Sequence, residues 1–152
     1  AIATVELPTL AIAVCDAFSM KSKDAQVTLA HALEATGVRA DPDILRRVLE
    51  NLVDNALRHA PKGSTVTLGS TRSGDHVQIR VRDFGKGVPA ELHERVFERF
   101  VQVEPENQGL TRTGRGLGLS FCKLAVEAHG GRIWLEDGSP GAIFCVELPA
   151  AE

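Results

Sequence analysis

Hydrophobic residues at helical spacing predict one long amphipathic helix between residues 41 and 60. The run Asp41-Pro42-Asp43 is a helix start, since it supplies a capping side chain, a proline at the first helical position and a carboxylate in the positive first turn. The apolar positions that follow share one broad stripe, made of Leu45, Leu49, Leu52, Val53 and Ala56. A proline and a glycine at 61 and 63 end the helix.

Shorter patterns on either side predict the remaining elements. Helices are expected over residues 8–23, 89–100 and 117–128. Alternation of apolar and polar residues predicts strands at 4–7, 26–32, 65–68, 77–81, 132–136 and 142–148, the last four joined as two hairpins. We therefore expect an α+β two-layer sandwich, in which about three helices pack on one face of a mixed, mostly antiparallel sheet.

Composition narrows the possible partners. The chain has 152 residues, 43% of them hydrophobic and 24% charged, which fits a single globular domain over residues 1–152. Its formal net charge of -3 gives no bulk attraction to nucleic acid or to an anionic membrane, so neither partner is expected. The most apolar stretch, residues 7–18, is too short to span a bilayer and contains Asp16.

The three cysteines, Cys15, Cys122 and Cys145, lie far apart in apolar stretches. Their spacing fits neither a metal site nor a disulfide framework. We expect them to be buried small hydrophobes in a reducing, cytoplasmic compartment.

A polar stripe interrupts the amphipathic pattern of the long helix. Asn51, Asn55 and Arg58 fall together on a face that is separate from the apolar stripe. Asparagine is a poor helix former, so two of them in mid-helix carry a small cost in stability. The stripe is either a solvated face or the wall of a cleft, where amide oxygens ligate Mg²⁺ and the arginine meets phosphate.

Two glycine-bearing segments suggest a nucleotide. The first, Asp83-Phe84-Gly85-Lys86-Gly87, is either a plain turn or a place where the backbone approaches a flat ligand and Asp83 accepts a hydrogen bond from an amine such as that of adenine. The second has three alternating glycines, Gly114, Gly116 and Gly118, at the start of a helix, where backbone N–H groups can surround an anion. Its spacing is neither that of a Rossmann fingerprint nor that of a P-loop.

Together these segments resemble the four boxes of sensor histidine kinases. Residues 50–56 resemble the N box, 83–87 the first glycine box, 94–100 the F box and 114–119 the second glycine box. The resemblance extends from about residue 5 to residue 148. It implies the ATP-binding fold that histidine kinases share with gyrase, Hsp90 and MutL.

The resemblance also implies roles for polar residues around the triphosphate of ATP. Asn55 would hold Mg²⁺, and Asn51 would support the metal and the phosphates. Arg58 and His59 would lie along the triphosphate, and Arg95 would reach the γ-phosphate. Asn51, Arg58 and Arg95 are thus the residues expected to take part in catalysis.

Adenine and the remaining phosphate contacts are assigned in the same way. Asp83 would bind the adenine amine, and the residues expected to shape its pocket are Gly85, Gly87 and Val88. The segment 101–115, which has no periodicity, would form a lid over ATP. Its end and the helix that follows would meet the phosphates through Gly114, Arg115, Gly116, Leu117 and Gly118.

A histidine acceptor with the family's setting is missing from the sequence. The family's acceptor lies on a helical hairpin, next to an acidic residue. None of the five histidines has that setting: His31, His59, His76, His93 and His129. We therefore expect a monomeric catalytic domain, excised from a longer two-component kinase. It would transfer the γ-phosphoryl group of ATP to a histidine on separate dimerisation helices, from which a response regulator receiver domain takes it in signal transduction.

Two alternatives remain. One is a degenerate module that binds nucleotide without kinase activity, because Val101-Gln102 stand where the family often has Tyr-Arg. The other is a serine kinase of the anti-sigma-factor kind. Gyrase-like and Hsp90-like ATPases have a glutamate at the position of Asn51 that activates water. An asparagine cannot act as that base, which favours a kinase over an ATPase.

Overall fold

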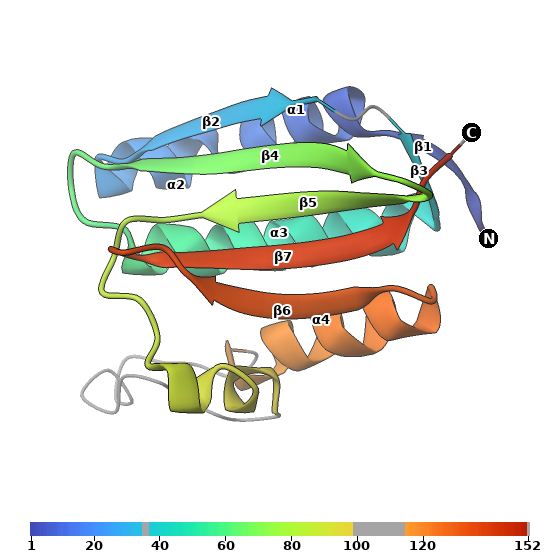
Figure 1. Ribbon diagram of the computed structural model, residues 1–152. Coiled ribbons are helices and arrows are strands. Elements are labelled where there is room, and N and C mark those ends of the chain that lie inside the picture. The colour runs from blue at the N-terminus through green and yellow to red at the C-terminus, as the bar shows by residue number, and fades with distance from the viewer. Residues whose placement is uncertain (35–36, 99–114, 152) are drawn as a thin grey trace.

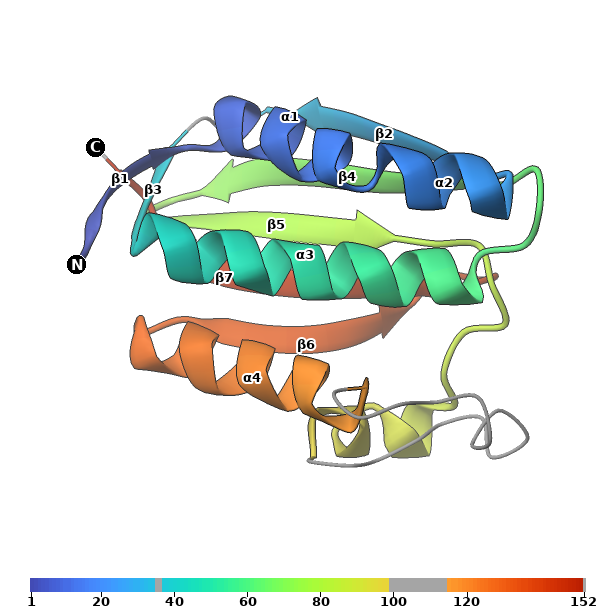
Figure 2. The same cartoon turned by 180° about the vertical axis from the view of Figure 1, so that it is seen from behind.

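The computed structural model of the chain describes residues 1–34, 37–98 and 115–151. Helices and strands form two layers, with the helices behind the sheet in Figure 1 and in front of it in Figure 2. The strands are β1 (Ala3–Glu6), β2 (Thr28–Leu33), β3 (Gly37–Ala40), β4 (Thr65–Ser73), β5 (His76–Arg82), β6 (Arg132–Asp137) and β7 (Ala142–Pro149). The helices are α1 (Leu7–Ala17), α2 (Ser19–Ala25), α3 (Pro42–His59) and α4 (Arg115–Ala128), with 3₁₀ turns η1 (Ala90–Leu92) and η2 (Arg95–Phe97).

The main sheet has five strands in the order β2-β4-β5-β7-β6. Among the described strands of this sheet, β2 and β4 pair in parallel and the other three pairs are antiparallel. Strands β1 and β3 form a separate antiparallel pair. The predicted fold class, a two-layer α+β sandwich with a mixed, mostly antiparallel sheet, is confirmed.

Helix α3 forms the centre of the helical layer. As the sequence predicts, the Asp41 side chain caps it by accepting from the backbone N–H groups of Asp43 and Ile44 at 3.0 and 3.2 Å. The apolar stripe of α3 is buried against the sheet, and Leu52 and Val53 are both 0% exposed. Each fully buried side chain of this kind contributes about 1.5–3 kcal/mol through removal of apolar surface from water. The stripe therefore fixes the orientation of α3, and with it the direction of the polar residues.

Three predicted elements differ in the structure. The expected helix over 8–23 is two helices, because the chain turns at Phe18 (φ −105°, ψ 11°), whose ring packs against the core. The short helix expected over 89–100 is the pair of 3₁₀ turns η1 and η2, as far as Glu98. Helix α4 begins at Arg115, so that residue belongs to the helix and not to the loop.

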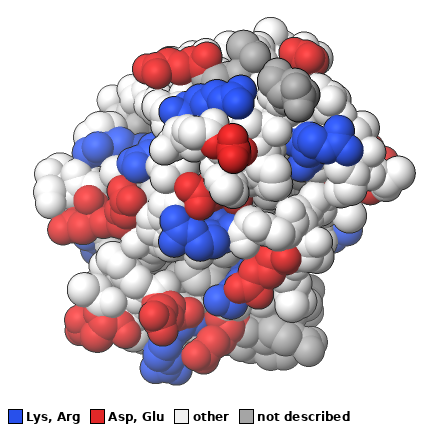
Figure 3. Space-filling model, turned by 45° about the vertical axis from the view of Figure 1, so that its right-hand side comes forward, with Lys and Arg blue, Asp and Glu red and all other residues white. Residues whose placement is uncertain are grey.

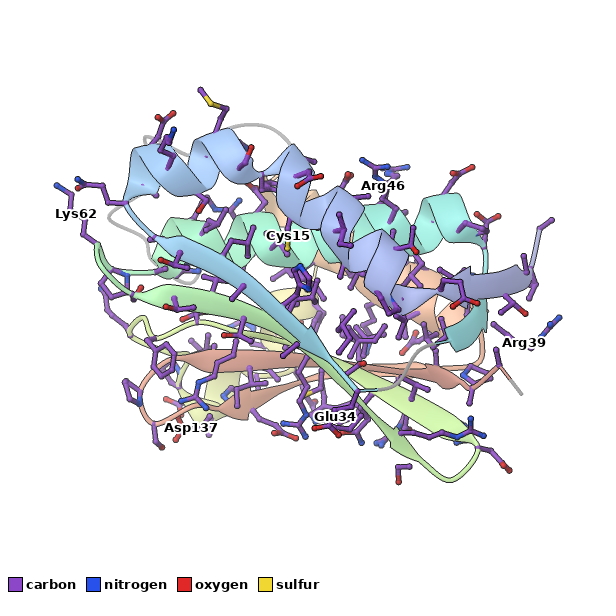
Figure 4. The ribbon with its side chains drawn as sticks, turned by 90° about the horizontal axis from the view of Figure 1, so that it is seen from above. Cys15, Glu34, Arg39, Arg46, Lys62 and Asp137 are labelled. Atoms are coloured by element: carbon purple, nitrogen blue, oxygen red, sulfur yellow. The ribbon has the colours of Figure 1, made fainter. Side chains whose placement is uncertain are left out.

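The cysteines confirm the prediction in two cases of three. Cys122 and Cys145 are buried, whereas Cys15 is half-buried, and all three thiols are free. Figure 4 shows the sulfur of Cys15 on the side of α1 that faces the sheet, while Arg46 points from α3 away from it. None of the described helices combines the length and apolar composition needed to cross a bilayer. On the face shown in Figure 3, basic and acidic side chains are interspersed rather than gathered by sign.

Candidate nucleotide-binding site

One pocket brings together residues that the sequence singles out from distant segments. It has about 440 Å³ of open space between the end of α3, the segment after β5, the start of α4 and β7. Its lining residues are Asn55, His59, Asp83, Lys86, Gly87, Val88, Val96, Leu119, Ala142 and Phe144. Apolar walls with a few polar groups among them are typical of a small-molecule site.

Asp83 is the buried carboxylate of this pocket. Its residue is 2% exposed. One carboxylate oxygen, Oδ1, accepts from the backbone N–H of Gly85 at 2.8 Å, and the backbone N–H of Asp83 donates to the Ala142 carbonyl at 3.0 Å. Burial raises the pKa of the Asp83 carboxyl, while the hydrogen bond from Gly85 and the nearby His59 act in the opposite direction. A buried acceptor in an apolar pocket selects a ligand that offers an N–H or O–H group.

Glycines allow the segment after Asp83 to pack between two backbones. A β-carbon on Gly85 would collide with the carbonyl oxygen of His59, at the end of α3. Gly87 has φ +79°, and a β-carbon there would lie 2.8 Å from the Gly141 carbonyl oxygen. The segment is thus held between α3 and the β6–β7 hairpin, which places the Asp83 carboxylate at the pocket wall. This packing explains the glycines, and the buried position of Asp83 in the pocket lining is what favours a binding role over a plain turn.

The polar stripe of α3 faces the same region. Asn55 is 6% exposed and lines the pocket, so the solvated-face alternative does not hold for it. Its amide oxygen Oδ1 accepts from an Arg58 guanidinium nitrogen at 3.3 Å. The amide oxygen of Asn51 lies 3.3 Å from the point where a β-carbon on Gly118 would stand. Helices α3 and α4 therefore meet at Asn51.

These donors fit a metal ion that arrives with phosphates. Among the described residues, no group of three or more His, Cys, Asp or Glu side chains could hold a metal ion by itself. Asn55 offers a single amide oxygen at the pocket wall. Mg²⁺ usually keeps several waters and takes one or two protein ligands together with substrate phosphates, so one amide oxygen is compatible with it.

The start of α4 is described only in part. Gly114 lies outside the described residues, and for residues 115–117 the structure describes the helical backbone but not the side chains. Gly118 faces Asn51, and Leu119 lines the pocket. The first turn of α4 directs backbone N–H groups out of its N-terminus, a place that favours an anion.

Arg95 of the F box and Glu50, the first residue of the N box, lie away from the pocket. The side chain of Arg95 on η2 is 60% exposed, lies 3.8 Å from a carboxylate oxygen of Glu98 and does not line the pocket. Its reach to the γ-phosphate stays a prediction. Glu50 pairs with Arg46 at 2.9 Å on the outer side of α3.

Sequence reasoning missed part of the apolar wall. Ala142 and Phe144 come from β7, where the alternating pattern predicts core positions and gives no sign of a pocket. Phe144 meets Phe97 of the F box edge to face, with ring centres 6.0 Å apart. The pairing of the last strand with β5 brings this wall opposite Asp83, and that pairing is not visible in the local pattern.

Comparison with known proteins gives the family. The sequence profile of the family described as histidine kinase-, DNA gyrase B-, and HSP90-like ATPase matches residues 40–152. The sensor protein IrlS of Burkholderia pseudomallei is 39% identical over 152 residues, covering 99% of this chain and 32% of IrlS. The adaptive-response sensory kinase SasA of a Nostoc species is 36% identical over 137 residues, covering 88% of this chain and 33% of SasA. The chain thus spans about a third of the length of these relatives.

Solved structures agree with the sequence matches. The nucleotide-free catalytic domain of the histidine kinase ThkA has a TM-score of 0.83 at 27% identity, covering 99% of this chain and 97% of that domain. The full-length histidine kinase ShkA in complex with AMPPNP has a TM-score of 0.86 at 28% identity, covering 99% of this chain and 31% of ShkA. The chain belongs to the family of histidine kinase-, DNA gyrase B- and HSP90-like ATPases, and within it to the ATP-binding catalytic domains of sensor histidine kinases.

Proposed function

We propose that this chain binds ATP together with Mg²⁺ and transfers the γ-phosphoryl group to a histidine on the dimerisation helices of its parent kinase. In this proposal residues 1–152 are a single catalytic domain, and the acceptor lies in another part of the parent. The observation that carries the proposal is the buried Asp83 carboxylate, set in an apolar pocket that also contains Asn55.

Adenine recognition is assigned to Asp83. The exocyclic amine of adenine is a hydrogen-bond donor, which a buried acceptor-only carboxylate matches. Val88, Val96 and Phe144 provide the apolar surface for the ring. A guanine offers a carbonyl oxygen at the same ring position, and two acceptors facing each other would leave both unpaired. The site therefore favours adenine over guanine nucleotides.

Phosphate binding is assigned to the end of α3 and the start of α4. Arg58 supplies a guanidinium beside Asn55, and the N-terminus of α4 supplies backbone N–H groups. Asn55 would hold Mg²⁺, which, when bound, neutralises charge on the phosphate oxygens. Asn51, next to Gly118, would keep the metal and the phosphates in place. Of the residues that the resemblance assigns to the phosphates, Gly114 lies outside the described part of the chain.

The transfer step itself requires little chemistry from this chain. An imidazole nitrogen of the acceptor forms a bond to the γ-phosphorus, while the bond to the β–γ bridging oxygen breaks and ADP leaves with the electron pair. The proton on the other imidazole nitrogen is released to solvent. Because Asn51 is an amide, it cannot remove a proton from water, so hydrolysis lacks a base at that position. Positioning and charge neutralisation are then the main contributions of this domain.

A response regulator is the proposed final acceptor of the phosphoryl group. The histidine kinase ThkA, 27% identical to this chain, has been solved in complex with the response regulator protein TrrA. By analogy, the receiver domain of a response regulator would take the phosphoryl group from the phosphohistidine of this chain's parent.

Binding of a fluorescent ADP analogue with Mg²⁺ tests the nucleotide site. Wild type is expected to bind, and Asp83→Asn to bind about tenfold to a hundredfold more weakly, because an amide donor would face the adenine amine at a cost of roughly 1–3 kcal/mol. Asp75→Asn, on the exposed turn between β4 and β5, is the matched control and should bind as wild type does. If wild type fails to bind, the nucleotide assignment is wrong.

Incubation with radiolabelled ATP and the parent's dimerisation domain tests the transfer. Label on that domain should be lost in acid and retained in base, as for phosphohistidine. Acid-stable label would point to the serine kinase alternative. Nucleotide binding without any label would support the degenerate module.

A further inference from the structure

Three charged side chains connect α2 to α3 beside the candidate nucleotide site. The two carboxylate oxygens of Asp54 accept separately, Oδ1 from Lys21 Nζ at 3.0 Å and Oδ2 from an Arg58 guanidinium nitrogen at 2.7 Å. Lys21 Nζ also lies 5.4 Å from the centre of the Phe18 ring. We call these three residues, Lys21, Asp54 and Arg58, the Asp54 clamp. It is anchored on two helices.

Both terminal nitrogens of Arg58 donate hydrogen bonds to neighbours on α3. One terminal nitrogen of its guanidinium donates to Asp54 and the other donates to Asn55 Oδ1 at 3.3 Å. The guanidinium thus lies between a carboxylate and the amide oxygen assigned to Mg²⁺. An arginine side chain has many rotamers, and a charge-assisted hydrogen bond at each end of its planar fork restricts them.

We infer that Asp54 is a positioning residue for the triphosphate, acting through Arg58. When the nucleotide binds, the Arg58 nitrogen that donates to Asn55 donates to a phosphate oxygen instead. The Arg58 nitrogen that donates to Asp54 keeps its hydrogen bond. Lys21 neutralises the second carboxylate oxygen, so the clamp carries a net charge of +1 (two cations and one anion) and does not repel the triphosphate. This inference rests on the proposed function, in which Arg58 meets the phosphates.

A purely structural role for Asp54 is the main alternative. The three side chains are partly or largely exposed, with relative exposures of 65% for Lys21, 32% for Asp54 and 27% for Arg58. Ion pairs of that exposure contribute little to stability, because water and salt screen them. The effect of removing Asp54 should therefore be found in ligand binding rather than in the stability of the fold.

Net charge and positioning predict opposite effects of Asp54→Asn on triphosphate affinity, which gives a sharp test. Asp54→Asn removes a negative charge close to the proposed phosphate site. If only the net charge mattered, the variant would bind a triphosphate more tightly than wild type. If Asp54 positions Arg58, the variant binds it more weakly, because the arginine must be ordered at the moment of binding.

The experiment measures the affinities of AMPPNP and of adenosine for this chain in the presence of Mg²⁺. For Asp54→Asn we expect an affinity for AMPPNP about threefold to tenfold lower and an unchanged affinity for adenosine, which reaches only the Asp83 pocket. Asp54→Glu should restore most of the loss, since Glu and Arg four residues apart pair well on a helix. Glu127→Gln breaks the Lys123–Glu127 pair, which has the same spacing on α4 and an N–O distance of 3.4 Å, and should change neither affinity.

A double-mutant cycle with Arg58→Met completes the test. If Asp54 acts through Arg58, adding Asp54→Asn to that variant should cause no further loss. An equal loss in both backgrounds, or AMPPNP binding by Asp54→Asn that matches or exceeds that of wild type, overturns the inference while leaving the proposed function in place. If wild type binds neither ligand, the proposed function fails and the inference fails with it.

Discussion

The amide oxygen of Asn51 on α3 lies 3.3 Å from the point where a β-carbon on Gly118 of α4 would stand. A β-carbon at Gly118 would crowd the Asn51 side chain at this distance, so the glycine favours the close approach of the two helices here. Asn55, the candidate metal ligand, follows one helical turn after Asn51. The contact therefore sets the distance between the proposed metal position and the N-terminus of α4, where phosphates would lie.

Gly118→Ala should affect stability and nucleotide binding in opposite directions. Alanine is a better helix former than glycine by about 0.8–1.0 kcal/mol. The atom that it would crowd belongs to the half-buried side chain of Asn51, which can move by a few tenths of an ångström. We expect an equal or higher melting temperature by calorimetry, with an affinity for Mg-ATP reduced by up to about tenfold because Asn51 is displaced. Unchanged affinity would show that Asn51 does not support the phosphates.

Asp83 should make nucleotide binding sensitive to mild acid. Burial raises the pKa of this carboxyl above its ordinary value of 3.8, so it takes up a proton at a higher pH than an exposed aspartate does. A protonated Asp83 loses acceptor capacity towards the adenine amine. Titrations at decreasing pH should show affinity falling as the pH drops through this raised pKa, and Asp83→Asn should remove that step. A step that persists in the variant would assign the titration to another group.

The same burial predicts that Asp83 lowers the stability of the nucleotide-free domain. The folded state holds the Asp83 proton more tightly than the unfolded state, so this group makes the free energy of unfolding fall as the pH rises from the unfolded pKa to the folded one. Above the folded pKa the full cost of the buried charge is present. Asp83→Asn keeps an acceptor oxygen for the Gly85 N–H and removes the charge. Its unfolding midpoint in urea at pH 7 should therefore equal or exceed that of wild type, although it binds nucleotide less well.

A pair of glycine substitutions separates backbone strain from packing. Gly141 has φ +93°, and a β-carbon there would run into the Asp83 carbonyl oxygen. Gly63 has φ +85°, but a β-carbon there would meet nothing within 4 Å. Gly63→Ala should therefore lower the free energy of unfolding by about 1–2 kcal/mol, because alanine disfavours the left-handed backbone conformation.

Gly141→Ala should lower the free energy of unfolding by more than Gly63→Ala does, and it should also deform the adenine pocket. Urea unfolding measures the first effect, and binding of the ADP analogue by the fraction that folds measures the second. Equal losses for the two variants would mean that the segment after β5 moves freely away from the β6–β7 hairpin.

Helix α3 shows which features could be predicted from the sequence. Its start, its end and its apolar stripe depend on neighbouring residues, and the structure confirms all three. Strand β3 was missed, because its four residues carry no distinctive alternation and form a strand only by pairing with β1. The break at Phe18 was also missed, since the apolar spacing continues through it and the turn depends on how the Phe18 ring packs.

The residues of the candidate site also fall into those that the sequence predicts and those that only the folded chain brings together. Asn55 stands out in the sequence as an asparagine in mid-helix, and Asp83 as a carboxylate followed by two glycines. The structure brings both to one pocket. Phe144 and Ala142 join them only because β7 pairs with β5, a contact between segments more than sixty residues apart. Arg95 matches the F box by its position, but its side chain lies 60% exposed beside Glu98.

Thiol labelling should rank the three cysteines by exposure. Burial raises the pKa of the Cys122 and Cys145 thiols to about 12, and Cys122 also donates to the Val48 carbonyl at 3.6 Å. Burial, followed by the charge of Asp16, raises the pKa of Cys15 as well, but this residue is only half-buried. Because the thiolate is the reactive form, iodoacetamide at pH 8 should modify Cys15 slowly and the other two hardly at all.

Peptide mapping by mass spectrometry measures the three rates, and the same reaction in urea, where all three thiols are exposed, is the control. Labelling of Cys122 in the folded domain at a rate equal to that of Cys15 would contradict this ranking. Cys122 on α4 donates a hydrogen bond to the Val48 carbonyl on α3, so such a result would also mean that the two helices separate on the timescale of the reaction. The close approach of Asn51 and Gly118 would then be only transient.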